Sequence, residues 1–144
     1  MATVTVIVGL SGSGKSHEAG KLKAAGAELF NEGVRPDVPH EWQRFFAVLA
    51  SGRDCAVVEI AYIGKAEREY LKREVLNRYP NTEFKWIFFE NNLEVANWNC
   101  SNDPDRTPEK VRGDHANNER WTVQYEIPKD VKQRKIFRLA ALKK

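Results

Sequence analysis

The sequence has little cysteine, no long hydrophobic run and no tract of one charge sign. Its two cysteines, Cys55 and Cys100, are far apart in the chain, so they suggest neither a disulfide framework nor a zinc site. We expect both thiols to be free and structural. No apolar run approaches the roughly 20 residues that a bilayer-spanning helix needs. Residues 1–10 also lack the basic region and cleavage site of a signal peptide, so we expect a cytoplasmic protein without a membrane partner.

The composition is that of one folded domain. A chain of 144 residues that is 42% hydrophobic and 10% aromatic has too much apolar content to remain disordered. Its length predicts a single domain over residues 1–144. The 23 basic and 20 acidic residues leave a net charge of +3. That balance permits a nucleic-acid partner without requiring one, and ordinary solubility charge explains it as well.

Short β-rich runs alternate with helical stretches along the chain. The patterns predict strands over residues 3–8, 27–30, 55–60, 84–89 and 135–139. They predict helices over residues 15–25, 40–51, 65–78 and 93–100, and a last helix that opens at Thr107 and Pro108. Such alternation is typical of a three-layer α/β fold with a mostly parallel sheet.

The last of these helices has an unusual composition. Its few apolar members are Val111, Ala116 and Trp121, so it has no continuous apolar face. A helix of this kind covers solvent or a ligand better than it packs on a core.

One motif carries chemistry, and it lies between the first predicted strand and the first predicted helix. Residues 9–16, GLSGSGKS, fit the pattern G-x-x-x-x-G-K-[ST]. Glycines let successive backbone N–H groups turn inward around phosphate oxygens, and the helix that follows points its positive end at the same anion. We expect these residues to bind a nucleoside triphosphate: Gly9, Ser11, Gly12, Ser13, Gly14, Lys15 and Ser16.

A bound triphosphate implies a magnesium ion beside it. Lys15 is expected to reach the β- and γ-phosphates, and the Ser16 hydroxyl is expected to bind Mg²⁺. The strand predicted over residues 55–60 contains Glu59 near its end, where a carboxylate can hold or orient a metal-bound water. The alternative for Glu59 is a charged side chain that faces solvent at a strand end.

The order of these features resembles that of a known family. A glycine loop at the start, a short second strand, an acidic strand and a polar segment before the last strand are similar to the P-loop kinases. Among these, the chain resembles the kinase domain of polynucleotide kinases. The resemblance implies a P-loop NTPase fold with a small polar lid, and an activity that transfers the γ-phosphate of ATP, with Mg²⁺, to a hydroxyl group.

The same resemblance suggests an acceptor site after the second strand. Polynucleotide kinases have there an Asp that takes the proton from the acceptor hydroxyl, and an Arg three residues later that helps bind the acceptor. Glu32 and Arg35 have this spacing, with Glu in place of Asp. Glu32 is therefore the candidate general base and Arg35 a candidate acceptor contact, with Asp37 as a second candidate base. The alternative is that these charges simply decorate a loop.

The segment expected to form the lid departs from the family pattern. P-loop kinases place arginines there to offset charge on the transferring phosphoryl group. Trp98 and Asn102 stand at those positions in this chain, and Arg106, Arg112 and Arg120 follow. Arg106 is the best candidate for the missing cation, and the ring of Trp98 offers a surface on which a base could stack.

These observations leave the acceptor open. It is the 5′-hydroxyl of a polynucleotide, or a hydroxymethyl group on a pyrimidine in DNA, as in the hydroxymethyluracil DNA kinases that the chain also resembles. A small-metabolite or mononucleotide kinase is the first alternative, and a nucleotide-hydrolysing regulatory module is the second. The sequence decides neither ATP against GTP nor the oligomeric state.

Overall fold

A computed structural model describes residues 2–31 and 34–138. Its strands form one five-stranded sheet in which every neighbouring pair is parallel. The strands are β1 (Thr3–Val8), β2 (Glu28–Phe30), β3 (Cys55–Val58), β4 (Glu83–Phe89) and β5 (Gln133–Arg134). The helices are α1 (Lys15–Ala24), α2 (Pro39–Ala50), the short 3₁₀ helix η1 (Ile60–Ile63), α3 (Lys65–Arg78), α4 (Leu93–Ser101) and α5 (Pro108–Thr122). The predicted α/β class and mostly parallel sheet are confirmed.

The sheet has the order β2-β3-β1-β4-β5, with β1 at its centre. β1 is rich in β-branched side chains and buried over almost its whole length, as expected for a parallel strand covered on both faces. It pairs with β3 on one side, Val6 opposite Val57, and with β4 on the other, Val6 opposite Trp86.

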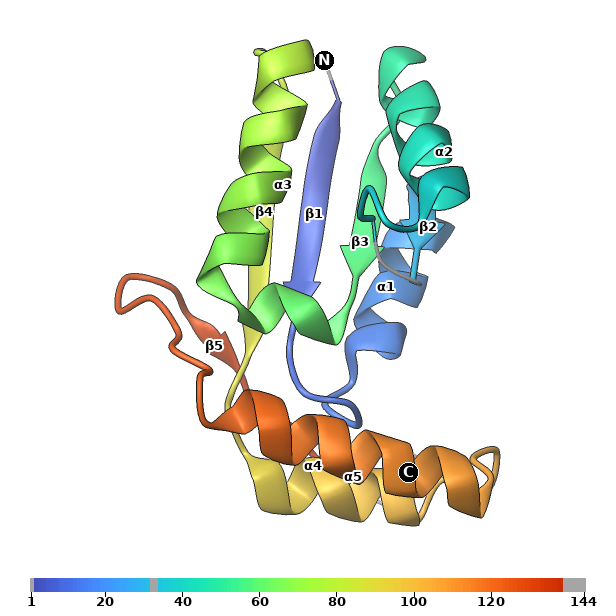
Figure 1. Ribbon diagram of the computed structural model, residues 1–144, viewed down its shortest axis with the longest axis vertical. Coiled ribbons are helices and arrows are strands. Elements are labelled where there is room, and N and C mark those ends of the chain that lie inside the picture. Colours follow the sequence, from blue (N-terminus) through green and yellow to red (C-terminus); the bar gives the residue numbers. More distant parts are fainter. Residues whose placement is uncertain (1, 32–33, 139–144) are drawn as a thin grey trace.

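Helices cover both faces of this sheet. Figure 1 shows α2 and α3 on one face of the sheet and α1 on the other. The chain runs from β1 to the edge strand β2 and then back across the sheet to β3 and β4. Since crossovers between parallel strands are right-handed, the two directions place their helices on opposite faces. Together the sheet and its two helical layers form three layers. The α4–α5 pair lies apart from these layers, across the carboxyl ends of the strands (Figure 1).

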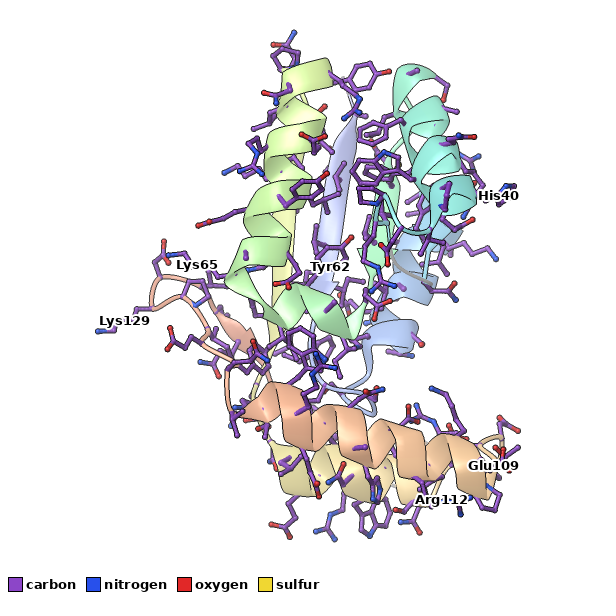
Figure 2. The ribbon with its side chains drawn as sticks, in the orientation of Figure 1. His40, Tyr62, Lys65, Glu109, Arg112 and Lys129 are labelled. Carbon is purple, nitrogen blue, oxygen red and sulfur yellow. The ribbon has the colours of Figure 1, made fainter. Side chains whose placement is uncertain are left out.

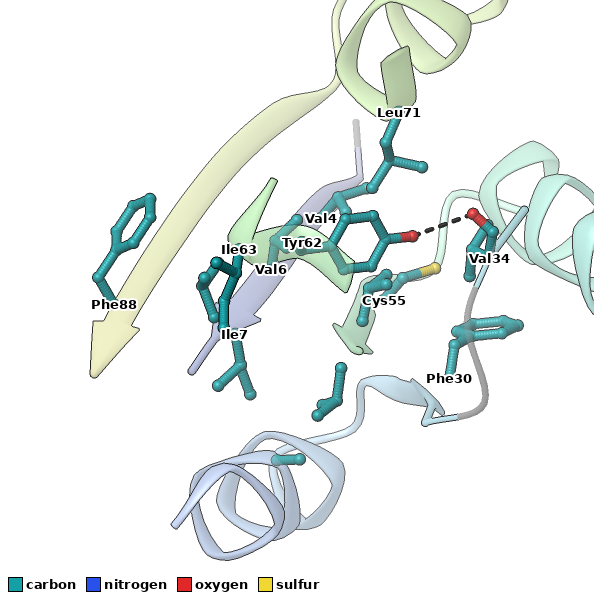
Figure 3. Close-up of a cluster of buried hydrophobic side chains, with 14 of the residues drawn as sticks. Val4, Val6, Ile7, Phe30, Val34, Cys55, Tyr62, Ile63, Leu71 and Phe88 are labelled. Atoms are coloured by element: carbon teal, nitrogen blue, oxygen red, sulfur yellow. Dashed lines mark hydrogen bonds between the residues drawn. The ribbon is translucent and has the colours of Figure 1, made fainter. Parts of the chain in front are cut away.

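One part of the core lies between the sheet and the helices α2 and α3 (Figure 1). Figure 3 shows Tyr62 reaching across it, and its hydroxyl donates a hydrogen bond to the Val34 carbonyl oxygen at 3.0 Å. Beside the sheet, the ring of Phe45 packs edge-to-face against Phe30, with 5.3 Å between ring centroids. Both cysteines are buried and free, as predicted; Cys55 is part of this core.

Most element boundaries lie within two residues of those predicted. α2 begins with Pro39 and α5 begins with Pro108, after Thr107, whose Oγ1 accepts a hydrogen bond from the Lys110 N–H at 3.1 Å. β3 is shorter than predicted, because the chain turns into η1 directly after Glu59.

The prediction of a last strand over residues 135–139 was wrong for residues 135–138, which form no strand; residue 139 lies outside the described residues. β5 consists of Gln133 and Arg134, which pair with Phe88 and Phe89. Since β4 ends at Phe89, the sheet has no strand position left for residue 135 to pair with. The alternation that predicted a strand has another cause, because Ile136 is buried while its neighbours are exposed.

No helix in the described part of the chain is both long enough and apolar enough to cross a membrane.

Substitution of a core residue tests this packing. We expect Phe45→Ala to lower the free energy of unfolding by about 3–5 kcal/mol, because it removes a fully buried ring and leaves a cavity. Val123→Ala is the control, since Val123 is 85% exposed and its truncation should change stability by less than about 0.5 kcal/mol. Urea denaturation followed by tryptophan fluorescence measures both, and equal losses for the two variants would contradict the described core.

Candidate functional site

The candidate site lies at the carboxyl ends of the central strands. The chain leaves β1 toward one edge of the sheet and leaves β4 toward the other, and ligands of open α/β sheets bind outside the strand ends at such a reversal. A cavity of about 520 Å³ opens there, between the end of the sheet and the α4–α5 pair. We call it the loop cavity, because residues 9–16, the glycine loop, form one of its walls.

The glycine loop needs its glycines for backbone geometry and for space. Gly12 and Gly14 have φ angles of 90° and 106°, in the region that other residues rarely adopt. A Cβ on Gly12 would lie 2.3 Å from the Ala96 carbonyl oxygen of α4. The backbone of the loop therefore lies directly against α4, at a distance that leaves no room for a side chain on Gly12. α1 begins directly after Gly14, so the unpaired N–H groups of its first turn face the same end of the sheet.

Lys15 is the half-buried cation of this loop. Its ammonium donates a hydrogen bond to the Gly9 carbonyl oxygen at 2.6 Å. Burial lowers the pKa of Lys15 to about 8, and the carboxylate of Glu59 partly opposes that shift. An anion that entered the cavity would favour the charged form of this amine.

The loop cavity brings together most of the residues predicted to bind a triphosphate and its metal. Those that line it are Ser11, Gly12, Gly14, Lys15, Ser16 and Glu59. Arg106, predicted as the cation of the lid, lines it as well. Gly9 and Ser13 do not line it. Gly9 accepts the Lys15 hydrogen bond, and Ser13 is buried with a hydroxyl oxygen that has no hydrogen-bond partner among the described residues.

The predicted acceptor residues that the structure describes, Arg35 and Asp37, lie elsewhere. Arg35 lines a second cavity, of about 490 Å³, which also includes Tyr62 and Tyr70. Its guanidinium Nε lies 3.3 Å from Asp37 Oδ1. Glu32, the candidate general base, lies outside the described residues.

Consecutive residues of the chain line the two cavities. Glu59 and Ile60 line the loop cavity, and the next residues, Ala61 and Tyr62, line the second cavity. A molecule in the second cavity would therefore lie beside the wall that carries Glu59.

α5 faces the glycine loop with polar side chains, which sequence reasoning missed. The only residues of α5 classed as buried are Asp114 and Asn118, among the residues that the structure describes. They continue a row that begins with Lys110, spaced four residues apart, so all three lie on one face of the helix. The low apolar content of α5 was the available signal. A search of the sequence for polar residues spaced four apart would have identified the face of α5 that is turned toward the glycine loop.

Two carboxamides tie the glycine loop to the helix pair. Asn118 accepts the Ser11 N–H at 2.8 Å through Oδ1 and donates to the Ser11 carbonyl oxygen at 2.9 Å through Nδ2. Asn99 of α4 donates to the Gly12 carbonyl oxygen, also at 2.8 Å. The shape of the loop thus depends on residues almost 90 and more than 100 positions further along the chain.

Arg106 reaches the loop cavity from the segment between α4 and α5. Its Nε lies 3.0 Å from Asp103 Oδ2, and its Nη1 lies 2.7 Å from Asp114 Oδ2. Nη1 also donates to the Sγ of Cys100, whose thiol in turn donates to the Ser11 carbonyl oxygen at 3.3 Å. Burial raises the pKa of that thiol, so Cys100 acts here as a neutral bridge between Arg106 and the loop.

The other candidates in this segment are turned elsewhere. Arg112 and Arg120 are exposed and do not line the loop cavity. The guanidinium of Arg138 lies over the ring of Trp98, 5.2 Å from its centroid. Stacking of a base on that ring face would have to displace Arg138.

The described residues include no group of three or more His, Cys, Asp or Glu side chains placed to hold a metal ion. Ser16 and Glu59 nevertheless line the same cavity.

Comparison of the chain with protein-family models, with curated proteins and with solved structures finds no match. A functional assignment therefore depends on the residues and their geometry.

The two adjacent asparagines of α5 offer a matched test of the carboxamide tie. We expect Asn118→Ala to lower the free energy of unfolding by about 1–3 kcal/mol, because it leaves the Ser11 N–H without a partner and leaves the Ser11 carbonyl oxygen with the Cys100 thiol alone. Asn117 is exposed, so Asn117→Ala should cost less than about 0.5 kcal/mol. Thermal and urea unfolding measure the difference, and similar values for the two variants would show that the tie contributes nothing.

Proposed function

We propose that the protein is an ATP- and Mg²⁺-dependent P-loop kinase that phosphorylates a hydroxyl group on a nucleic acid or a nucleotide. The observation that carries this proposal is the composition of the loop cavity. Residues from three distant parts of the chain meet there: the glycine loop with Lys15 and Ser16, Glu59 after β3, and the segment that runs from Arg106 to the inner face of α5.

The glycine loop supplies the contacts that a polyphosphate needs. Backbone N–H groups at the start of α1 offer hydrogen-bond donors and the positive end of the helix. The ammonium of Lys15 gives up its bond to Gly9 and binds the β- and γ-phosphate oxygens instead. Burial lowers the pKa of this amine, and a bound triphosphate would favour its charged form and so raise the pKa again.

Ser16 and Glu59 fit a magnesium ion that is bound together with the nucleotide. Mg²⁺ usually takes one or two protein ligands and completes its shell with phosphate oxygens and water. Ser16 would be a direct ligand, and Glu59 would hold a metal-bound water from the end of β3. The ion supplies charge neutralisation on the β- and γ-phosphates when it is bound.

Arg106 and the α4–α5 pair act as the lid. The transferring phosphoryl group develops charge on its equatorial oxygens, and a guanidinium beside it stabilises that charge. Arg106 lines the same cavity as Lys15, so it approaches the phosphates from the side opposite the loop. It replaces the lid arginines whose positions are taken by Trp98 and Asn102.

The acceptor enters through the second cavity. Arg35 and Arg73 line it together with Tyr70, so it offers cations for phosphate groups and an aromatic ring for a base. Glu32 takes the proton from the acceptor hydroxyl as the new bond to phosphorus forms. Both a 5′-hydroxyl end and a hydroxymethyl pyrimidine carry the phosphates and the base that these side chains recognise.

A transfer assay tests the proposal. The protein is incubated with Mg²⁺, γ-labelled ATP and one acceptor from a panel: hydroxyl-ended oligonucleotides, hydroxymethylated DNA, nucleosides, or buffer alone. We expect label in one of the DNA substrates. Label in nucleosides alone would favour a small-molecule kinase, and free phosphate alone would favour a hydrolase; either outcome would overturn the proposed acceptor.

Two variants assign roles within that assay. Lys15→Ala should lower turnover by several orders of magnitude, because it removes the cation from the phosphates. Glu32→Gln should keep ATP affinity within a few-fold but slow transfer, because the amide cannot accept a proton. Equal loss of binding and transfer in Glu32→Gln would argue against a base.

The pKa of Lys15 gives a second, independent prediction. The amine is mostly neutral above pH 8 in the empty cavity, and a bound triphosphate favours its charged form. ATP binding should therefore take up about 0.9 proton at pH 9 but only about 0.1 at pH 7. Calorimetry in buffers of different ionisation enthalpy measures this uptake. Lys21→Met, on the exposed side of α1, should behave like the wild type, and uptake that does not rise with pH would contradict the assignment of Lys15.

A further inference from the structure

Asp114 is an almost wholly buried carboxylate between two cations. Its side chain is 2% exposed. Oδ1 lies 2.7 Å from the Nζ of Lys110, and Oδ2 lies 2.7 Å from Nη1 of Arg106. Each oxygen thus holds one positive charge, and all three side chains line the loop cavity.

A role in stability alone accounts poorly for this arrangement. The side chain of Lys110 is 64% exposed, so folding does not require it to bend toward a buried carboxylate. Replacement of a buried ion pair by apolar residues is often neutral or stabilising. Val111 and Ala116 show that apolar residues occur elsewhere in α5. Packing and stability alone therefore do not explain a carboxylate at position 114.

The charges that line the loop cavity are balanced. Three cations and three carboxylates line it: Lys15, Arg106, Lys110, Glu59, Asp103 and Asp114. In such a cavity the carboxylates hold the cations in place while no anion is bound. A polyphosphate offers the same cations more oxygens and more charge.

We infer that Asp114 is a positioning residue that holds Arg106 and Lys110 as a pair above the glycine loop, ready for the terminal phosphate of the nucleotide. Lys110 is then a second cation that contacts this phosphate, in addition to Arg106. The inference rests on the proposed function, since it assumes a triphosphate in the loop cavity. It adds a reason why the lid works without arginines at positions 98 and 102.

The pair is useful because its geometry is set before the nucleotide arrives. Long cationic side chains lose rotamer freedom when they bind, and a carboxylate that already orders them reduces that loss. Asp114 also keeps one oxygen on each cation, so both charged groups are held at the cavity. The phosphate then meets two oriented donors instead of two mobile ones.

Lys110 is tested by comparing two nucleotides. Lys110→Met should weaken ATP binding about 10-fold while it changes ADP binding less than about 2-fold, because only ATP has the terminal phosphate. Arg112→Met is the matched control. Arg112 lies on the same helix, near Glu109 at the end farthest from β5 (Figure 2), and does not line the cavity. Equal weakening of ATP and ADP in Lys110→Met would overturn the role of Lys110.

Asp114 is tested by chemical rescue of its partner. Arg106→Ala should lose about 100-fold in kcat, as expected for removal of one donor to the transition state. Added guanidinium ion should restore part of that activity by occupying the gap beside the Asp114 carboxylate. In the double variant Arg106→Ala/Asp114→Asn the same ion should restore nothing. Rescue of equal size in both variants would refute a positioning role for Asp114.

Asp114→Asn alone completes the test. We expect kcat per folded molecule to fall at least about 10-fold while the KM for ATP changes less than about 3-fold, since the loop and Lys15 carry most of the binding. Circular dichroism gives the folded fraction. Glu109→Gln, an exposed carboxylate in the first turn of α5, should match the wild type. An unchanged kcat per folded molecule in Asp114→Asn would show a purely structural role.

The outcomes distinguish this inference from the proposed function. If the wild-type protein neither binds ATP nor transfers its phosphate, the proposed function fails and the inference fails with it. If the wild type transfers phosphate but Lys110→Met and the rescue assay give the overturning results, the inference alone fails.

Discussion

The arrangement of the site depends on the hydrogen bonds between the Asn118 carboxamide and the two backbone groups of Ser11. They connect a loop at the start of the chain to a helix near its end, and so fix where α5 stands above the central strands. Asp114 and Lys110 are on the same face of that helix, about one turn and two turns away from Asn118, so their positions follow. A carboxamide suits this task because it donates and accepts at once, as a peptide group does.

The electrostatics of the loop cavity follow from the burial of Lys15. Removing a charged ammonium from water is unfavourable, and this desolvation lowers the pKa of Lys15. The Gly9 carbonyl oxygen and the nearby Glu59 offset part of it. Around this one amine the helix pair adds Arg106 and Lys110, each held by a carboxylate. The three cations that line the cavity are thus matched by three carboxylates, and the proposed triphosphate would add contacts to the cations that Asp114 holds.

Local patterns predicted most of the fold, and the failures have physical causes. The β-branched run of β1 and the cap formed by Thr107 depend on near neighbours in the chain, and both were predicted. The prediction of a strand over residues 135–139 failed over residues 135–138, because a strand needs a partner strand and β4 ends at Phe89. Within the site, the glycine loop and Glu59 could be found from their place after strands. Asp114 and Asn118 could not, because polar residues on a helix are ordinarily assigned to solvent.

The sequence alone determined where the glycine loop lies and which backbone angles are open to it, since Gly12 and Gly14 permit angles that other residues avoid and α1 follows them. It also determined that a lysine and a serine stand at the start of that helix. Only the tertiary structure decided which groups meet them. Arg106 faces the loop while Arg112 does not, although both belong to one short polar segment. The direction of a side chain in space depends on how α4 and α5 pack across the sheet, and that packing is set by contacts between residues almost 90 or more positions apart.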